Sequence, residues 1–427
     1  MRSLILWLLS TVAALAIWTA LVVIGSLYGW WQESLAPDGD ARAFMDAAVA
    51  EIDERHHGNV AFVLIENRRI FEEYYTSVGA RIDRDTLFQV SSLSKWITAY
   101  GVMTLVEAGD IDLDAPVSTY LKRWSLPDSE YDNGGVTVRR LLSHTAGLTD
   151  GLGFAGFAPG TDVQTLEEAL TNPNSSPGHE GRIRVGYPPG TEWQYSGGGY
   201  LLLQLLIEEV SGTTFEAYMQ RAVFDPLGMS RSTYALEDGS SNLAVSYDVD
   251  GTPGILYRFT ALAATSLYTT AADMARFIQA HLAHVSQPSR RSRPSRQEAL
   301  KPETLKLMRQ PHGSAMGADI WGLGTMLYAP NGDDDFVVGH DGRNEPAINT
   351  TVRVNPATGD GIVILETGNL LLASTLAGEW VFWQTGRIDV LMIVIGAEDM
   401  IKVVIAGWAA VLLAGLLIGW RMRRRPI

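Results

Sequence analysis

The sequence predicts an α+β body between two membrane-spanning helices. Residues that alternate as strands occur near both ends of the central region, helical patterns fill its middle, and an uncharged apolar run lies at each end of the chain. Strands from both ends that enclose a helical middle indicate one antiparallel sheet, with helices packed on it and a mostly helical lobe beside it. We expect this body to cover residues 38–385.

The composition is that of a large globular protein. The chain has 427 residues, of which 46% are hydrophobic and 19% charged, so it can bury a large core. Its net charge of −15 argues against nucleic-acid binding, which needs a clustered basic surface. The absence of cysteine excludes disulfides, thiolate catalysis and cysteine-ligated zinc. We expect neither a metal ion nor another cofactor.

The first apolar run predicts a transmembrane anchor over residues 1–30. Leu4 to Ile24 is 21 residues without a charge; as a helix it would span roughly 31 Å, which matches the hydrocarbon core of a bilayer. The apolar character continues through Trp30 and Trp31, whereas a secretory signal has a shorter apolar region that ends in a small-x-small cleavage site. We therefore favour an uncleaved anchor over a cleaved signal.

The second run predicts a transmembrane helix over residues 403–420, followed by a basic tail at 421–427. Flanking Lys and Arg residues mark the cytoplasmic side, so we expect both termini inside and the body outside, with the lipid bilayer as a partner. Val390 to Ile395 is apolar but too short to span. An interfacial connector over residues 386–402 and a core strand or helix end are both open readings of it.

The N-terminal half of the body begins with a helix and a hairpin. We expect a helix over Asp40–Arg55 with an Asp cap, and a β-hairpin over Asn59–Ser77. An apolar helix that carries Lys95 follows and ends before Gly109, and Gly- and Pro-rich sequence with short helical patterns then runs to about Pro189. Further helices are expected over Tyr200–Val210, Phe215–Phe224 and Thr270–Ala283.

The C-terminal half completes the sheet. Residues 286–297 are basic and of low complexity, which predicts a surface insertion; contact with acidic headgroups or polymer is the less favoured reading. The turn Pro356–Asp360 should join the last two strands, and Leu371–Gln384 should be a closing helix. The expected strands are Trp321–Tyr328, Phe336–Gly339, Ile348–Asn355 and Gly361–Glu366.

Ser92 and Lys95 form the candidate nucleophile and base. One helical turn apart, they would lie on one face, and a serine needs a neighbour that accepts its proton. The chain has 28 arginines and five lysines, and only a lysine can lose its proton near neutral pH in a desolvated pocket. With 28 serines, roughly a one in three chance of an accidental SxxK remains, so the context must support the pair.

That context comes from three stretches in order, Ser92-Leu-Ser-Lys95, Tyr195-Ser196-Gly197 and Gly339-His340-Asp341-Gly342. They resemble the serine β-lactamase and penicillin-binding-protein family, specifically its class C-like branch, over roughly residues 40 to 385. The resemblance implies a β-lactamase/transpeptidase-like fold. Other matching stretches are Leu141–Leu148, Pro189-Gly190, Gly199–Leu203 and Pro226–Met229.

The resemblance also implies an acyl-enzyme mechanism. Ser92 would attack, Lys95 would hold or take its proton, and Tyr195 would act as phenolate base and then as acid. A tyrosine can be a base only where nearby cations lower its pKa, and Lys95 would be such a cation. Backbone N–H groups of Ser92 and Arg343 would hold the oxyanion. His340 would donate a hydrogen bond near the substrate carboxylate or to Tyr195.

Two departures from the family pattern bear on the substrate. Gly197 stands where the family usually has asparagine, whose amide holds the substrate carbonyl. After Gly342 the chain reads Arg343-Asn-Glu-Pro346, where relatives tend to have small residues. Both favour an esterase or a peptidase acting on D-amino-acid peptides over a dedicated β-lactamase. The expected substrate is a small molecule or peptide, such as a cell-wall fragment.

Two other functional readings are weaker. A catalytically weak binding or regulatory protein that senses cell-wall fragments would not need Ser92, Lys95 and Tyr195 intact. A Ser-His-Asp triad of Ser143, His144 and Asp150 is disfavoured because sequence neighbours rarely form one, and no G-x-S-x-G elbow is present. We expect His144 to make a structural loop hydrogen bond.

Overall fold

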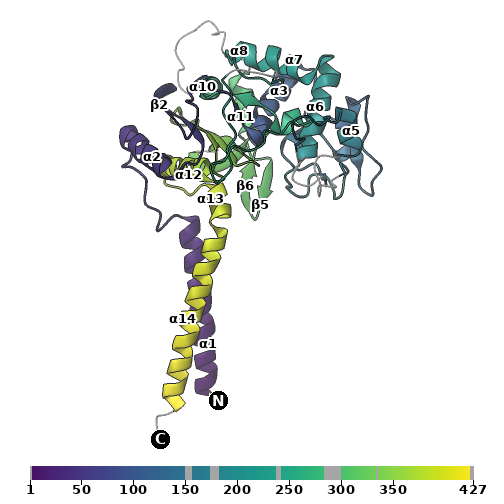
Figure 1. Cartoon of the computed structure of the whole chain (residues 1–427). Coiled ribbons are helices and arrows are strands. Elements are labelled where there is room, and N and C mark those ends of the chain that lie inside the picture. The colour runs from purple at the N-terminus through teal and green to yellow at the C-terminus, as the bar shows by residue number, and fades with distance from the viewer. Residues whose placement is uncertain are drawn as a thin grey trace.

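The computed structural model describes residues 2–149, 156–173, 182–236, 242–282, 300–332 and 335–423. A folded body lies at one end of two long helices that run side by side, and both chain termini lie at the far end of these helices (Figure 1). The body is α+β, as predicted. Asp150 and the basic segment 286–297 lie outside the described residues.

Within the described residues, eight antiparallel strands form the main sheet, in the order β2-β1-β10-β9-β8-β7-β6-β5. The predicted hairpin is present, and its first strand pairs with β10, with Val63 opposite Val363. The two ends of the body therefore meet inside one sheet, which confirms the predicted arrangement. The strands are β1 (Asn59–Glu66), β2 (Arg69–Ser77), β5 (Gly313–Ala315), β6 (Ala318–Trp321), β7 (Met326–Gly332), β8 (Asp335–Asn344), β9 (Ile348–Asn355) and β10 (Asp360–Thr367).

Two strand predictions were wrong in extent. The predicted strand Trp321–Tyr328 is divided between β6 and β7, because Gly322 and Gly324 form a turn between them. β8 does not end at Gly339 but continues through the next five residues to Asn344. Glycine and polar residues there have low strand propensity, but β8 pairs with β7 and β9 on its two sides, and this pairing decides the conformation.

Helices cover both faces of the sheet, which explains why β1 and β10 carry apolar runs without alternation. Along β1, Ala61, Val63 and Ile65 belong to one buried cluster, and their neighbours Val60, Phe62 and Leu64 belong to the other. The first cluster contains residues of α3 (Ser94–Ala108) and α10 (Ala271–Leu282). The second contains residues of α2 (Ala41–Arg55) and α12 (Leu372–Thr385).

The helical lobe is built around α6 (Gly197–Ser211), which starts three residues before the predicted Tyr200. Ser196 caps it, because the Ser196 Oγ accepts a hydrogen bond from the Gly199 N–H at 2.8 Å. The predicted helix Phe215–Phe224 is α7 (Phe215–Met219), continued as a π-helix over Gln220–Phe224. Shorter elements are α4 (Val138–Leu142), α5 (Leu166–Thr171), α8 (Asp225–Leu227), α9 (Leu262–Thr265), α11 (Pro302–Met308), the pair β3 (Phe88–Gln89) and β4 (Tyr268–Thr269), and 3-10 turns at Ser91–Leu93, Val117–Thr119 and Asn133–Gly135.

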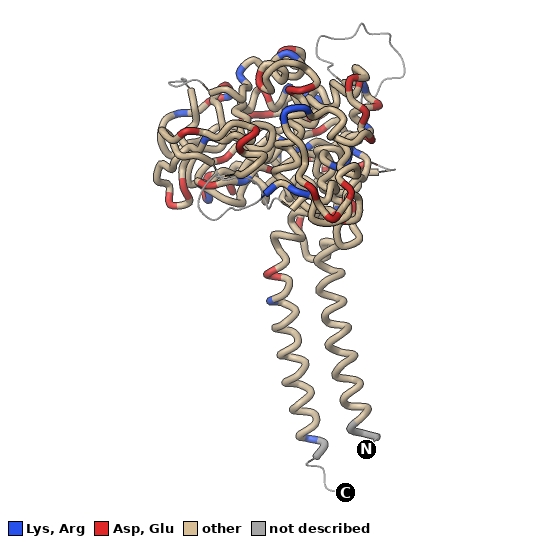
Figure 2. Tube along the Cα trace, turned by 90° about the vertical axis from the view of Figure 1, so that its right-hand side faces the viewer, with Lys and Arg blue, Asp and Glu red and all other residues tan. Residues whose placement is uncertain are grey.

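The terminal helices α1 (Arg2–Leu27) and α14 (Ala397–Arg423) are each long and apolar enough to cross a membrane. Figure 2 shows that charged residues are sparse along both. The helices contact each other closely: the Trp7 Nε1 donates to the Gly415 carbonyl at 3.0 Å, and a Cβ on Gly407 would lie 1.9 Å from the Trp18 Nε1. Small residues on α14 thus admit tryptophans of α1. The short helix α13 (Val390–Ile395) precedes α14.

Candidate active site

Ser92 lies on the 3-10 turn Ser91–Leu93, immediately before α3 rather than within its first turn. Among residues 91–95, all in the described part of the chain, only Ser92 is partly exposed. Ser91 has a φ of 49°, a conformation that costs a non-glycine residue about 1–3 kcal/mol. The Ser91 Oγ donates to the Arg343 carbonyl at 3.0 Å, so a contact with β8 supports the strained turn that presents Ser92.

Lys95 lies behind Ser92 on the first turn of α3 and is 2% exposed. Its Nζ lies 3.2 Å from the Ser92 Oγ and donates to the Ala264 carbonyl of α9 at 2.8 Å. The same Nζ lies 4.8 Å from the centre of the Tyr195 ring. The predicted nucleophile and base are therefore within hydrogen-bond reach of each other, and the loop before α6 brings Tyr195 beside them.

Tyr195 differs from the expectation in its ionisation. Burial raises its pKa above the ordinary value, and a hydrogen bond with Ser92 opposes this only in part. The ring packs against His144 at 4.5 Å and Trp321 at 5.7 Å between ring centres. These apolar surroundings disfavour a charged phenolate. Tyr195 is therefore protonated at neutral pH, and its phenolic hydroxyl is a hydrogen-bond donor.

His340 on β8 is also neutral. Burial, together with the charge of Lys95, lowers the pKa of His340 to about 3. Its Nδ1 lies 2.6 Å from the Asp341 carbonyl, so this nitrogen carries the single proton and the Nε2 is left as an acceptor. The sequence predicted a hydrogen-bond donor at this position. The structure corrects this, because the backbone carbonyl already takes the one N–H that a neutral imidazole has.

Gly342 and Arg343 bring the edge of β8 against the turn that carries Ser92. A Cβ on Gly342 would lie 2.0 Å from the Val90 carbonyl oxygen, and the Thr350 Oγ1 donates to that same oxygen at 2.9 Å. Only glycine permits this approach. The Arg343 side chain is exposed, and Gly197 is buried in the first turn of α6. The predicted residues thus lie on three segments that converge.

His144 and Trp321 are site residues that the sequence reasoning missed. His144 makes the expected loop hydrogen bond, since its Nδ1 accepts from the Ser196 N–H at 3.1 Å. Its ring also packs on Tyr195, and burial, Lys95 and His340 lower its pKa. The Trp321 ring lies 4.7 Å from His144 and 5.3 Å from His340. The matching stretch Leu141–Leu148 was the available signal for His144; Trp321 lies in no such stretch.

The triad reading of His144 gains no support. The Ser143 Oγ lies 2.8 Å from the Thr145 Oγ1, and no hydrogen bond joins Ser143 to His144 among the described residues. The side chain of α3 within hydrogen-bond reach of the candidate nucleophile Ser92 is Lys95.

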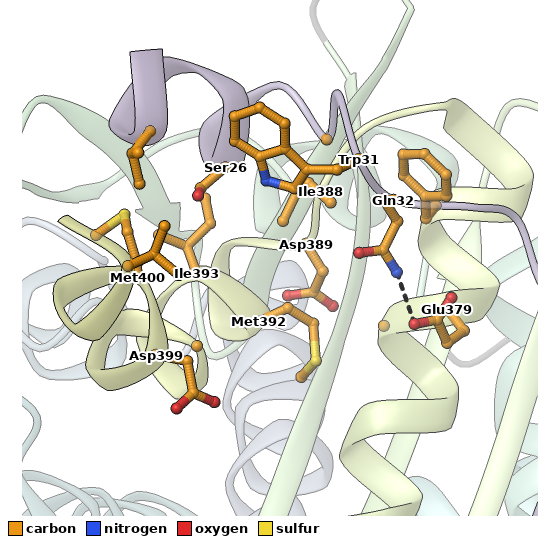
Figure 3. Close-up of a pocket in the computed structure, with 16 residues that line it drawn as sticks. Ser26, Trp31, Gln32, Glu379, Ile388, Asp389, Met392, Ile393, Asp399 and Met400 are labelled. Carbon is orange, nitrogen blue, oxygen red and sulfur yellow. Dashed lines mark hydrogen bonds between the residues drawn. The ribbon is translucent and has the colours of Figure 1, made fainter. Parts of the chain in front are cut away.

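A pocket of about 400 Å³ lies away from this site, where α1 and α14 meet the body (Figure 3). None of the seven predicted site residues, all of which are described, lines it. The candidate active site is therefore located by the mutual geometry of Ser92, Lys95 and Tyr195, which is the arrangement that acyl transfer requires, and not by this pocket.

Comparison with known proteins identifies the family to which this sequence is similar. The model of the family described as Beta-lactamase matches residues 42–377. Penicillin-binding protein 4 of Amycolatopsis lactamdurans is 27% identical over 309 residues, which cover 69% of this chain and 76% of the relative. Esterase EstB of Burkholderia gladioli is 32% identical over 188 residues, which cover 41% of this chain and 45% of the esterase.

Solved structures agree on the fold. The octameric penicillin-binding protein homologue from Pyrococcus abyssi superposes with a TM-score of 0.64 at 22% identity, covering 82% of this chain and 78% of the homologue. At this sequence identity the match supports the fold only. The match to the esterase covers less than half of that protein. The activity of the esterase is therefore not assigned to this chain.

Proposed function

Because the chain belongs to the beta-lactamase family of serine hydrolases, we propose that it cleaves an amide or ester through an acyl-Ser92 intermediate. The observation that carries this proposal is the 3.2 Å separation of the Lys95 Nζ from the Ser92 Oγ, with Tyr195 hydrogen-bonded to the same hydroxyl. A serine with a base and an acid both in reach can be activated and can also release a leaving group.

The ionisation of Tyr195 suggests how the protons move. Ser92 attacks the carbonyl carbon while its proton passes to Lys95 in the amine form. Tyr195, protonated because burial raises its pKa, gives its proton to the leaving amine or alkoxide, and Lys95 then returns a proton to Tyr195. Water then attacks the acyl carbon, its proton passes to the Lys95 amine, and Lys95 gives that proton to the departing Ser92 oxygen, which restores the hydroxyl and releases the acid. This proposal makes Lys95 the base and Tyr195 the acid.

The oxyanion is proposed to bind the backbone N–H groups of Ser92 and Arg343. The contact of the Ser91 Oγ with the Arg343 carbonyl supports this, because it holds β8 beside the nucleophile turn before substrate arrives. Donors that are in place beforehand need no reorganisation as charge develops on oxygen.

For the substrate we propose an ester or a D-amino-acid peptide, within a class C-like mechanism. Gly197 lacks the amide that would hold a lactam carbonyl. Arg343 and Glu345 are exposed at the end of β8, where they would meet the substrate. Both features favour esterase or peptidase activity over antibiotic hydrolysis.

We also propose that α1 and α14 cross the membrane and hold the body on its outer side. The ends of both helices that lie far from the body are together (Figure 1), and arginines are found at these ends, as expected for a cytoplasmic side. A phosphatase fused after Ile427 should therefore be inactive and a fluorescent protein at the same position bright. Phosphatase activity at that position would contradict this topology.

Labelling tests the chemistry. The detergent-solubilised full chain is treated with a fluorescent fluorophosphonate and with a fluorescent penicillin, beside the Ser92→Ala and Tyr195→Phe variants. We expect fluorophosphonate label that Ser92→Ala abolishes. Fluorophosphonate label without penicillin label would favour an esterase or peptidase. Absence of Ser92-dependent label from both probes would contradict the enzyme and favour a binding protein.

A further inference from the structure

A buried ion-pair network joins the candidate active-site strand to the segment that leads into α14. Arg353 of β9 is fully buried between Asp341 of β8 and Asp389, which immediately precedes α13. The Arg353 Nη1 pairs with the Asp389 Oδ2, and the Nη2 lies 3.4 Å from both Asp341 carboxylate oxygens. A guanidinium removed from water in this way depends on its counter-charges.

Asp341 is held in one orientation by this network. Its carboxylate accepts hydrogen bonds from Tyr328 at 2.6 Å, Thr351 at 2.7 Å and Ser374 at 2.5 Å. Burial opposes ionisation of Asp341, but Arg353 and these three hydroxyls together lower its pKa. Asp341 is therefore a fixed anion at neutral pH, with side chains of β7, β9 and α12 around it.

The backbone of Asp341 in turn fixes His340. The Asp341 carbonyl accepts the hydrogen bond from the His340 Nδ1 at 2.6 Å. The His340 Nε2 is buried and has no hydrogen-bond partner among the described residues. His340 and Tyr195 both pack on the Trp321 ring, at 5.3 and 5.7 Å. The acceptor nitrogen is thus left available for the Tyr195 hydroxyl or for a donor on the substrate.

We propose that Asp389 and Arg353 are positioning residues of the active site, which act by holding Asp341 and, through it, the ring of His340. The inference rests on the proposed function of Ser92. Asp389 lies beside the pocket between the body and the terminal helices, with Ile388 and Met392 as its neighbours in Figure 3. Its Oδ1 accepts from the Leu391 N–H at 2.6 Å, so the start of α13 and the site strand share one anchor.

The test compares Asp389→Asn with a matched control in the detergent-solubilised full chain. Asparagine keeps the acceptor for the Leu391 N–H and removes the charge. The control is Asp273→Asn, which neutralises another buried carboxylate that pairs with an arginine, Arg276 at 2.6 Å, on α10. The rate constant of fluorophosphonate labelling at saturation and the concentration that gives half saturation are measured well below both thermal midpoints.

We expect Asp389→Asn to lower the saturating rate about tenfold with the half-saturation concentration unchanged, because residues of one hydrogen-bonded network are coupled. Asp273→Asn should leave both quantities unchanged. His340→Ala should itself lower the labelling rate. In that background Asp389→Asn should lower the rate no further, because Asp389 is proposed to act through the imidazole ring that His340→Ala removes. Ser374→Ala removes one of the hydroxyl groups that bond to Asp341. We expect it to lower the saturating labelling rate about threefold, and it serves as the test if Asp389→Asn does not fold.

Two results would overturn the inference and leave the proposed function intact. In the first, the wild-type protein labels at Ser92 and Asp389→Asn labels at the same rate as Asp273→Asn. In the second, Asp389→Asn lowers the labelling rate by the same factor in the His340→Ala background as in the wild type. If Asp389→Asn does not fold, Ser374→Ala at the wild-type rate overturns the inference in the same way. A wild-type protein without Ser92-dependent label would instead refute the proposed function and the inference with it. The two failures are therefore distinguishable.

Discussion

At the scale of single residues, the surroundings of Tyr195 and His340 bear on which group beside Ser92 can move a proton. Tyr195 keeps its proton because burial raises its pKa, and burial is the main reason why His340 is neutral. We propose Lys95 as the base because its Nζ lies 3.2 Å from the Ser92 Oγ. The proposed roles of base and acid rest on these surroundings and not on residue type alone.

Replacement of Lys95 tests that assignment. Lys95→Arg keeps a positive charge, but a guanidinium does not lose its proton in proteins. We expect Ser92 labelling, measured per folded protein, to fall at least about a hundredfold, the usual contribution of a positioned base. Lys122→Arg, the same change on an exposed lysine, should label normally. Labelling of Lys95→Arg close to the wild-type rate would exclude Lys95 as the base.

Replacement of Gly342 tests the contact between β8 and the nucleophile turn. In Gly342→Ala the new Cβ would lie 2.0 Å from the Val90 carbonyl oxygen and 2.5 Å from the Thr350 Oγ1, so the strand must move. We expect a loss of about 1–3 kcal/mol in the free energy of unfolding and slower Ser92 labelling. Gly419→Ala, whose Cβ would have its nearest neighbours at 3.6 Å, is the control. A normal thermal midpoint and labelling rate in Gly342→Ala would contradict the close approach.

At the scale of elements, α10 shows how burial makes stability depend on pH. His281 is 4% exposed, and its ring lies 4.8 Å from Trp96 and 4.4 Å from Phe277. Burial lowers its pKa to about 3, although a hydrogen bond to the Phe277 carbonyl opposes this. Below pH 6.5 the unfolded chain binds a proton that the folded chain excludes. The stability from this residue is therefore complete above pH 6.5 and declines as pH falls towards 3.

His281→Phe should weaken this dependence. Each excluded proton costs about 1.4 kcal/mol per pH unit, so the loss of stability between pH 7 and pH 5 should be smaller by about 2 kcal/mol than in the wild type. The measurement is the thermal midpoint at both pH values in detergent. His57→Phe, the same change at an exposed position, is the control. An unchanged difference between the two midpoints in His281→Phe would show that His281 is not buried in the neutral form.

The elements themselves were largely predictable from local sequence. The Asp40 cap, the hairpin of β1 and β2, and the end of α3 at Gly109, with a φ of 80°, follow from caps, alternation and glycine. The start of α6 and the length of β8 were not predictable, since three glycines and a Gly-His-Asp-Gly run have low propensity. Capping by Ser196 and pairing on both sides of β8 override that propensity.

At the scale of the whole molecule, the two terminal helices form one paired unit below the body. Besides Trp7 and Trp18, the Trp408 Nε1 donates to the Thr19 Oγ1 at 2.8 Å. These bonds from indole nitrogens lie at several levels along the pair. An apolar environment leaves few alternative partners for such groups, so the contacts favour one register of α1 against α14.

The register can be tested by cross-linking because the natural chain has no cysteine. A Cβ on Gly415 would lie 3.4 Å from the Thr11 Oγ1, so the two side chains are direct neighbours and cysteines at these positions can approach the geometry of a disulfide. We expect Thr11→Cys/Gly415→Cys to form an intramolecular disulfide on mild oxidation, seen as a mobility shift that reductant reverses. Thr11→Cys/Gly419→Cys, displaced by about one helical turn along α14 at a glycine whose added Cβ would have its nearest neighbours at 3.6 Å, should not. Equal cross-linking of both pairs would contradict a fixed register.

The sequence by itself determined the residue types that carry the chemistry, the apolar length of both terminal helices and the meeting of the two ends of the body in one antiparallel sheet. These features follow from the order of apolar, polar and turn-forming residues within short stretches of the sequence. Only the tertiary structure shows that burial raises the pKa of Tyr195 and lowers that of His340, and that His144 and Trp321 pack beside them. Burial and hydrogen-bond partners set a pKa and a tautomer, and both come from segments far apart in the chain.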